Sequence, residues 1–567
     1  MLELRKKRMI ISCWAMTMAF ALITWHLYNI QLVKGNSYAL RASRIRSHEV
    51  VLEEFMRGEI TDRNQLPLSG GYFANRVVVF PKLMQDQQKE LDQLAQTLGQ
   101  NPVDLYKKAR NGAFYLNLNL TSEQLKSLQT APPEGVFLLP VYMRYGDKPL
   151  ASHITGYLGK ISSREQFEQL QKNSTKNYNL GDWVGQSGLE YFYEQELKGT
   201  YPQRWARIAL DAMGRVIHGE GLAVNTSAVD PARRNVVTTI DRNIQQVVES
   251  VMDTRVESGA VIVMKAGSGD ILAMASRPGY DPSPSMVGRS LASRHGDVYV
   301  DHCISIFQPG SVFKVVLAAA AIDLGKVDLD ERFTCLGANA EPVRCWLDGG
   351  HGRIAFHQAF AESCNPTFVE IGRRLGANSI INYAEAFGLS NQAIAGYPVK
   401  RDKRQNLAAI GEKYNLANSS VGQGPVLVTP VQVTAMMNVI ASGGLYYAPR
   451  LVTGVADEQG CFVRVIGQPA PTRAISVYTA GVMKKLLREV TETGVGTQAR
   501  VTQWGSAGKT GSAQLDNAGG KVDAWFSGYI PADRPKYVIT VLVHGGSSGG
   551  TTAAPVFKEI AEKIMQF

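Results

Sequence analysis

Ser311 and Lys314 stand three residues apart at the start of an apolar run, VFKVVLAAAAIDL, that has helical character. Residues i and i+3 share one face of a helix, so the two side chains can meet there. A serine hydroxyl is a poor nucleophile until a base takes its proton, and a lysine whose pKa is lowered by burial or by nearby cations can be that base. Backbone N–H groups at the helix N-terminus can also receive an oxyanion. The pair therefore predicts nucleophilic catalysis by Ser311.

The Ser-x-x-Lys pattern is weak evidence when taken alone. A serine that only caps a helix has the same spacing, and Ser506 with Lys509 repeats it. Ser506, however, lies among glycines ahead of a strand-like segment, where residues i and i+3 point to opposite faces. Ser311 is therefore the favoured nucleophile.

Two further short motifs carry polar groups that suit a peptide substrate. In Ser363-Cys364-Asn365 a hydroxyl that can relay a proton is two residues from an amide that can bind a peptide group. In 509–512, Lys-Thr-Gly-Ser, an ammonium and a hydroxyl suit a carboxylate, and the glycine permits close approach of the backbone. Each motif alone also fits a structural loop. The three occur in order with gaps of about 50 and about 145 residues, a set typical of β-lactamases and penicillin-binding proteins.

Other segments match one branch of these proteins. The matching segments are 57–64 (RGEITDRN), 185–190 (GQSGLE) with 193–199, Cys345-Trp346 with 350–352 (GHG), and 422–424 (GQG) with 429–430. With the three motifs they make the whole chain resemble the class B penicillin-binding proteins, the monofunctional D,D-transpeptidases of peptidoglycan. One departure is Gln65, which stands where the family pattern has glycine.

The resemblance implies roles for the residues that would do the chemistry. Ser311 would attack the carbonyl between the last two D-alanines of a stem peptide, and Lys314 would accept its proton. Ser363 and Lys509 would pass a proton to the leaving D-alanine. An amine of a neighbouring stem peptide would then resolve the acyl-enzyme.

The resemblance also implies substrate-binding roles. Asn365 would hold the donor peptide, and Thr510 and Ser512 would bind its terminal carboxylate, next to Gly511. Backbone N–H groups of Ser311 and Ser512 would form the oxyanion hole. No cofactor is implied. β-Lactams, as analogues of the stem peptide, would acylate the same serine.

The N-terminus predicts a membrane anchor. Residues 1–8 end in a basic cluster, and residues 9–33 form an uncharged run of about 25 residues, long enough to cross a bilayer. The basic cluster places the N-terminus in the cytoplasm and the rest of the chain outside. A cleaved signal peptide is the alternative, but its apolar part would be shorter, and no convincing cleavage site follows.

After the anchor, the pattern of strand-like and helical segments predicts two domains. Residues 34–228 mix strand-like and helical pieces without a catalytic cluster and are expected to be a pedestal that contacts partners. Residues 229–567 hold the three motifs, with strand hairpins near both ends and helices between them. The expected fold is therefore α+β: a transmembrane helix, a mixed α/β pedestal, and a transpeptidase domain with a central antiparallel sheet flanked by helices.

The cysteines and the net charge limit which metal sites and binding partners are expected. Cys335 and Cys345 bracket a short loop and are either a disulfide or two free buried thiols. No second Cys/His pair has zinc spacing, so no metal site is predicted, and Cys364 is expected to be packing. The net charge of +10 suits an anionic membrane or polymer, whereas nucleic acid is not expected, because no nucleic-acid-binding motif is found.

Rival functions fit less well. A β-lactamase would be smaller and lack a pedestal, and a β-lactam sensor would carry several spans and a zinc protease motif. A scaffold that has lost its activity should lack a motif residue. A class A enzyme would need a glycosyltransferase domain, and the G-x-S-x-G match at 546–550 lacks the strand–turn–helix context of a hydrolase. The resemblance implies a polytopic glycosyltransferase as partner and leaves division, elongation and sporulation as possible settings.

Overall fold

The computed structural model describes residues 2–33, 47–174, 176–209, 222–226, 229–287, 296–515 and 520–567. They divide into two compact units. The first contains residues 1–56, 72–144 and 201–230, and the second contains residues 57–71, 145–200 and 231–567. The units interleave along the chain, and the boundary placed between residues 228 and 229 stays a prediction.

The N-terminal segment is helical, as its composition predicts. Helix α1 (Leu2–Tyr28) continues into a short π-helical turn, η1 (Asn29–Val33). The stretch Arg8–Gln31 is long and apolar enough to cross a membrane, and none of it is buried by the rest of the protein. The exposed side chains include Trp14 and Trp25, which would be costly in water.

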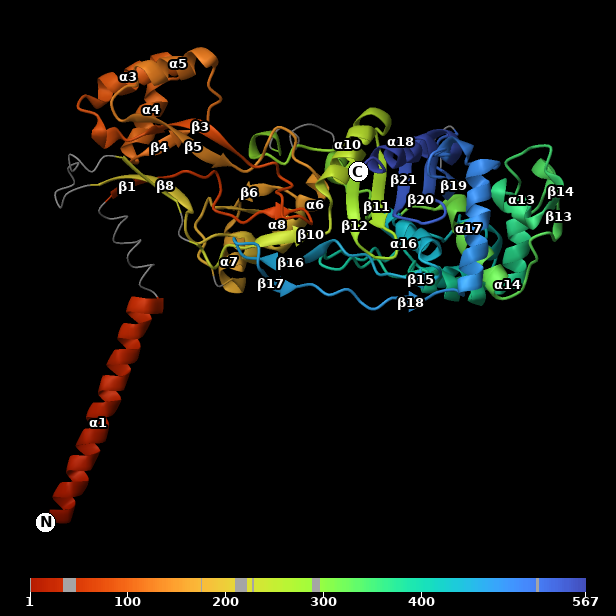
Figure 1. Cartoon of the computed structure of the whole chain (residues 1–567), viewed down its shortest axis with the longest axis horizontal. Coiled ribbons are helices and arrows are strands. Elements are labelled where there is room, and N and C mark those ends of the chain that lie inside the picture. The colour runs from red at the N-terminus through yellow and green to blue at the C-terminus, as the bar shows by residue number, and fades with distance from the viewer. Residues whose placement is uncertain are drawn as a thin grey trace. The chain divides into compact units, whose positions relative to one another are not determined.

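The first unit is built on a three-stranded antiparallel sheet with the strand order β4-β3-β5. Its strands are β3 (Tyr72–Val79), β4 (Phe114–Leu116) and β5 (Val136–Met143). One face packs on helices α3 (Gln87–Leu98), α4 (Pro102–Arg110) and α5 (Ser122–Thr130), which lie together over these strands in Figure 1. The other face packs on a second sheet, β1-β8-β9, made of β1 (Ser47–Val51), β8 (Arg204–Ala209) and β9 (Leu222–Thr226).

The second unit is built on a five-stranded sheet that is antiparallel throughout, with the order β12-β11-β21-β20-β19. Figure 1 shows the strands side by side in this order. They are β11 (Gly259–Lys265), β12 (Ile271–Arg277), β19 (Ala507–Gln514), β20 (Val522–Ile530) and β21 (Tyr537–Gly546). Both predicted hairpins are confirmed, and they pair with each other through β11 and β21.

Helices cover both faces of this sheet, because successive residues of a strand point to opposite sides. Val261 and Val263 of β11 face α10 (Arg242–Arg255) and α18 (Ala554–Ile564). Ala260 and Ile262 face the other way, into the large core. That core is formed with helices α12 (Lys314–Asp323), α14 (Asn365–Ala386), α16 (Pro430–Ala441) and α17 (Val477–Glu492). The expected antiparallel sheet flanked by helices is thus confirmed.

One predicted strand joins a different sheet. The segment NVVTTID does form a strand, β10 (Asn235–Thr238), but it lies in the four-stranded sheet β17-β16-β10-β2. Its partners are β2 (Ile60–Thr61), β16 (Val452–Ala456) and β17 (Phe462–Val465). The apolar pattern predicts a strand but does not encode which neighbour it pairs with.

Two of the segments on which the resemblance rests meet in the second unit. The guanidinium of Arg57 is buried and lies 2.9 Å from the carboxylate of Glu190 and 2.8 Å from that of Glu194. At the end of the first segment, Gln65 has φ +64°, which explains why the family pattern has glycine there. The turn forms with glutamine, whose amide donates to the Gly460 carbonyl at 3.1 Å.

Candidate active site

Ser311 lies in a short 3₁₀ turn, η4 (Gly310–Phe313), which leads directly into helix α12. The residue before it, Gly310, has φ +54°, and a Cβ there would lie 3.1 Å from the Ser512 carbonyl group. Its N–H donates to the Gly422 carbonyl at 2.9 Å, which brings the 422–424 segment against the turn. The turn is therefore fixed against strand β19, and Ser311 itself is partly exposed to solvent.

Lys314 begins helix α12 and is fully buried. Its ammonium nitrogen, Nζ, donates to the Asn365 Oδ1 at 2.7 Å and to the Ser363 carbonyl at 2.8 Å, with the Ser363 hydroxyl at 3.3 Å. Burial lowers the pKa of Lys314 to about 7, because water no longer solvates the charged form. A neutral amine has two N–H groups, and the two short bonds can use both. Its lone pair is then free to take a proton.

Ser363 lies in the turn between helices α13 (Phe356–Ala361) and α14, and Asn365 is the first residue of α14. Ser363 has φ +55°, an unfavourable conformation for a residue with a side chain, and such outliers gather at functional sites. The Asn365 amide nitrogen donates to the Arg344 carbonyl at 2.8 Å, and the indole N–H of Trp346 donates to the Glu362 carbonyl at 2.8 Å. The turn is thereby held against the 344–346 segment.

Strand β19 carries the Lys-Thr-Gly-Ser motif at the edge of the five-stranded sheet. Thr510 and Ser512 share one face of the strand because they are two residues apart. Ser512 accepts a hydrogen bond from the Gly549 N–H at 3.0 Å. Gly511 has no room for a side chain, since a Cβ would lie 2.6 Å from the Pro309 carbonyl oxygen. The glycine therefore lets β19 approach the turn that holds Ser311.

Lys509 is the second buried amine of the site. Burial, and then the charge of Lys314, hold its pKa well below the usual range. Its Nζ lies 3.4 Å from the Thr510 carbonyl and 5.8 Å from the centre of the Phe360 ring. Two amines that repel each other in one buried site favour a single shared charge rather than two.

Ser506, the alternative nucleophile in the sequence, makes hydrogen bonds that stabilise the fold. It is buried just before β19, where its hydroxyl donates to the Ala499 carbonyl at 2.8 Å and accepts from the Val501 N–H at 3.2 Å. These bonds link the strand to the turn before it. The hydroxyl thus serves the fold and is not directed at a lysine.

The structure brings residues of all three motifs close together, since Lys314 contacts Ser363 and Asn365, and Gly310 lies against Ser512. The sequence did not predict that the 335–351 segment supports the Ser363 turn through Arg344 and Trp346. It also did not predict that Cys335, Cys345 and Cys364 would meet His351 beside that turn. The only available signal was the family likeness of Cys345-Trp346 and of residues 350–352.

Known protein families match both units. The penicillin binding protein transpeptidase domain matches residues 259–562, which is more than half of the chain. The penicillin-binding protein dimerisation domain matches residues 53–227. The three motifs around Ser311 all lie within the first match.

Relatives extend over nearly the whole chain. Stage V sporulation protein D of Bacillus subtilis is 28% identical over 582 residues, which cover 98% of this chain and 85% of that protein. The peptidoglycan D,D-transpeptidase MrdA of Haemophilus influenzae is 24% identical, over 99% of this chain and 91% of that protein.

Solved structures show the same fold. Penicillin binding protein 3 from Mycobacterium tuberculosis, complexed with aztreonam, has a TM-score of 0.59 at 22% identity and covers 91% of this chain and 96% of its own. A chain from a peptidoglycan synthase complex that coordinates polymerization and crosslinking has a TM-score of 0.70 at 21% identity, covering 98% and 97%. With a dimerisation domain, a transpeptidase domain and all three motifs in order, the chain belongs to the class B penicillin-binding proteins.

Proposed function

We propose that this transpeptidase cross-links peptidoglycan stem peptides through an acyl-enzyme on Ser311. One observation carries the proposal: Lys314 is buried one turn after Ser311, and its pKa is lowered to about 7. A base of this pKa can take the proton of a serine hydroxyl near neutral pH. The hydrogen bonds of Ser363 and Asn365 to Lys314 orient its amine for that task.

In the proposed acylation, the Ser311 hydroxyl oxygen attacks the carbonyl carbon between the last two D-alanines, and its proton passes to Lys314. The C–N bond then breaks. The leaving D-alanine takes a proton delivered through Ser363 and Lys509. In the second half, an amine of a neighbouring stem peptide attacks the ester, loses one proton and restores the Ser311 hydroxyl. A new amide bond replaces the one that was broken.

Strand β19 and the turn of Ser311 supply the binding groups. Thr510 and Ser512 offer hydroxyls on one face of the strand for the terminal carboxylate. The backbone N–H groups of Ser311 and Ser512 are the proposed oxyanion donors, and the approach of Gly310 to Ser512 favours this pairing. Such a donor typically contributes about 10²–10³ in rate. Both polar atoms of Asn365 already have partners, so binding the donor peptide would exchange one of them.

The setting of the reaction follows from helix α1. We propose that α1 crosses the cytoplasmic membrane once, with residues 1–8 in the cytoplasm, because positive residues precede the span. The catalytic residues would then face the peptidoglycan. A polytopic peptidoglycan glycosyltransferase is the proposed partner, and the likeness of the whole chain to one from a peptidoglycan synthase complex supports this.

Purified full-length chain, incubated with a pentapeptide donor and an amine acceptor, tests the reaction. The expected products are free D-alanine and a cross-linked peptide, in amounts that rise together. Ser311→Ala should form neither product. Release of D-alanine without any cross-link, at all acceptor concentrations, would identify a carboxypeptidase instead and contradict the proposal.

A further inference from the structure

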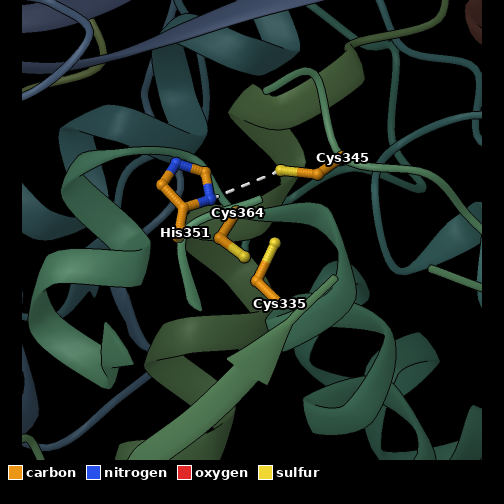
Figure 2. Close-up of side chains that lie close together, drawn as sticks. All are labelled: Cys335, Cys345, His351 and Cys364. Carbon is orange, nitrogen blue, oxygen red and sulfur yellow. Dashed lines mark hydrogen bonds between the residues drawn. The ribbon is translucent and has the colours of Figure 1, made fainter. Parts of the chain in front are cut away.

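Beside the Ser363 turn, three cysteines and one histidine converge from separate parts of the chain. Cys335 ends strand β13 (Arg332–Cys335), Cys345 lies in the following loop, His351 directly precedes β14 (Gly352–Ala355), and Cys364 separates α13 from α14. Their ligand atoms all lie within 4.8 Å of one another. Figure 2 shows the three sulfurs and one ring nitrogen of His351 directed into a common space.

We propose that this Cys335-Cys345-His351-Cys364 cluster binds a zinc ion. Three thiolates and one imidazole are a common ligand set of structural zinc sites, with Zn–S near 2.3 Å and Zn–N near 2.1 Å. A tetrahedron with these bonds has S···N edges of about 3.6 Å and S···S edges of about 3.8 Å. The distance between Cys345 Sγ and His351 Nδ1 is 3.5 Å. The cluster therefore needs only a small contraction around the ion.

The four residues are buried or half-buried, and backbone hydrogen bonds hold two of them in place, as expected for a closed metal site. Cys335 is 1% exposed and Cys364 is fully buried, so four protein ligands would shield the ion from water. Backbone hydrogen bonds hold the ligands in place: Cys345 N–H donates to the Gly337 carbonyl at 3.1 Å, and Cys364 N–H donates to the Ala359 carbonyl at 2.8 Å. A site with no open position stabilises structure and does not activate water.

A disulfide is the competing use of these thiols. All three are free in the structure. A Cys335–Cys345 disulfide would account for two of the four residues. It would not explain why Cys364 and His351 lie beside them. A zinc ion uses all four, and its binding releases the thiol protons.

The cluster has a direct connection to the catalytic residues. Cys364 stands between Ser363 and Asn365, and both of these bind the Lys314 amine. The loop that carries Cys345 also contacts the turn, since the Arg344 carbonyl accepts from Asn365. We infer that the ion fixes the turn in the conformation that orients Lys314. This second step rests on the proposed function, whereas the metal site itself does not.

Metal analysis of the detergent-solubilised full chain tests the site. We expect about one zinc ion per chain by elemental mass spectrometry, as for a four-ligand structural site. Cys335→Ser and His351→Gln should weaken zinc binding at least tenfold, because losing even a residue that only supports a ligand costs about 10–100-fold in affinity. Cys303→Ser, a buried cysteine outside the cluster, is the matched control and should keep its zinc.

Cobalt exchange keeps the test independent of the variants' folding. The wild-type chain loaded with Co²⁺ should show intense visible bands of a tetrahedral site and thiolate-to-cobalt charge transfer in the near ultraviolet. A wild-type chain without zinc that carries a Cys335–Cys345 disulfide would overturn the proposal. So would iron in place of zinc, or equal zinc loss in Cys303→Ser.

Removal of the ion tests its effect on the active site. Stripping zinc from the wild-type chain with a chelator should reduce acylation by penicillin at least tenfold, and added Zn²⁺ should restore it. Unchanged acylation by zinc-free protein would overturn the positioning role alone. A zinc-loaded chain that penicillin never acylates would instead contradict the proposed function and leave the metal site standing.

Discussion

Burial prepares the Lys314 amine for its proposed role as the base. In water its pKa would be near 10.5, and burial lowers it to about 7, although the nearby Cys364 and Cys345 thiols act in the opposite direction. The hydrogen-bond acceptors around it, the Ser363 carbonyl and the Asn365 amide oxygen, still tolerate the protonated form. The amine can therefore cycle between charged and neutral states during one turnover, which a general base must do.

This environment predicts the pH dependence of acylation. A lowered lysine pKa means that the neutral base is scarce below about pH 7 and dominant above it. The rate of acylation by penicillin should thus rise as pH increases through about 7 and then level off. Stopped-flow labelling across this range measures it, and a rate that falls with rising pH would assign the base to another group.

Lys314→Arg is the matching variant. Arginine keeps the positive charge but is not deprotonated near neutral pH, so acylation should fall by several orders of magnitude. Circular dichroism and thermal unfolding serve as controls, because the larger side chain enters a buried site. A folded variant with near-normal acylation would exclude Lys314 as the proton acceptor.

Thr510 offers a test of substrate binding. Thr510→Val preserves the shape of the side chain but removes the hydroxyl proposed to bind the terminal carboxylate. We expect acylation by penicillin and by a stem peptide to weaken by roughly 1–3 kcal/mol in transition-state free energy. Comparison of kcat/KM for both substrates measures this, and a loss of thermal stability with unchanged kcat/KM would show a structural role only.

At the scale of elements, Arg57 connects two segments that are far apart in the sequence. It joins Glu190 of helix α8 (Gly188–Phe192) and Glu194 of helix α9 (Glu194–Leu197). Removing one partner of a buried ion pair leaves uncompensated charge in the interior. Arg57→Ala should therefore destabilise the second unit by about 3–5 kcal/mol.

An exposed ion pair on the same helix provides the control. Arg464 binds Glu196 at 2.7 Å, but it is largely exposed, so Arg464→Ala should cost about 1 kcal/mol or less. Denaturant unfolding followed by tryptophan fluorescence compares the two variants. Equal losses would contradict the view that burial of Arg57 makes its contacts important.

Much of the element scale could be predicted from the sequence. The β11–β12 and β20–β21 hairpins have strong strand patterns on both sides of clear turns, and Asp86, Thr121 and Asp241 cap helices where side chains accept backbone hydrogen bonds. The partners of β10 could not be predicted, because a short apolar strand fits several sheets.

The parts of the candidate site that lie within one short motif could be predicted from the sequence. The parts formed by distant segments could not. Ser311 and Lys314 are joined by one helical turn, so their spacing suffices. The left-handed conformation of Ser363 and the meeting of Cys364 with the 335–351 loop depend on tertiary packing. Sequence rules for zinc sites look for two ligands close together in one segment. They miss a site in which each of the four ligands comes from a different position in the chain.

At the scale of the whole molecule, the proposed orientation of helix α1 would place the catalytic residues outside the cytoplasm. If the basic cluster keeps the N-terminus in the cytoplasm, a protease added to intact spheroplasts should digest the region after residue 34. Lysed spheroplasts are the control for full access. Protection of that region in intact spheroplasts, with digestion after lysis, would reverse the proposed orientation.

The account as a whole depends on one residue being the nucleophile, and the sequence offers two serines with the same spacing to a lysine. Ser311 is partly exposed at the start of α12, whereas Ser506 is buried and bonded to Ala499 and Val501. The most direct measurement is peptide mass spectrometry of the chain after reaction with penicillin. We predict a covalent adduct on the peptide that contains Ser311, its loss in Ser311→Ala, and its retention in Ser506→Ala. An adduct on Ser506, or labelling of Ser311→Ala at the wild-type rate, would contradict the account.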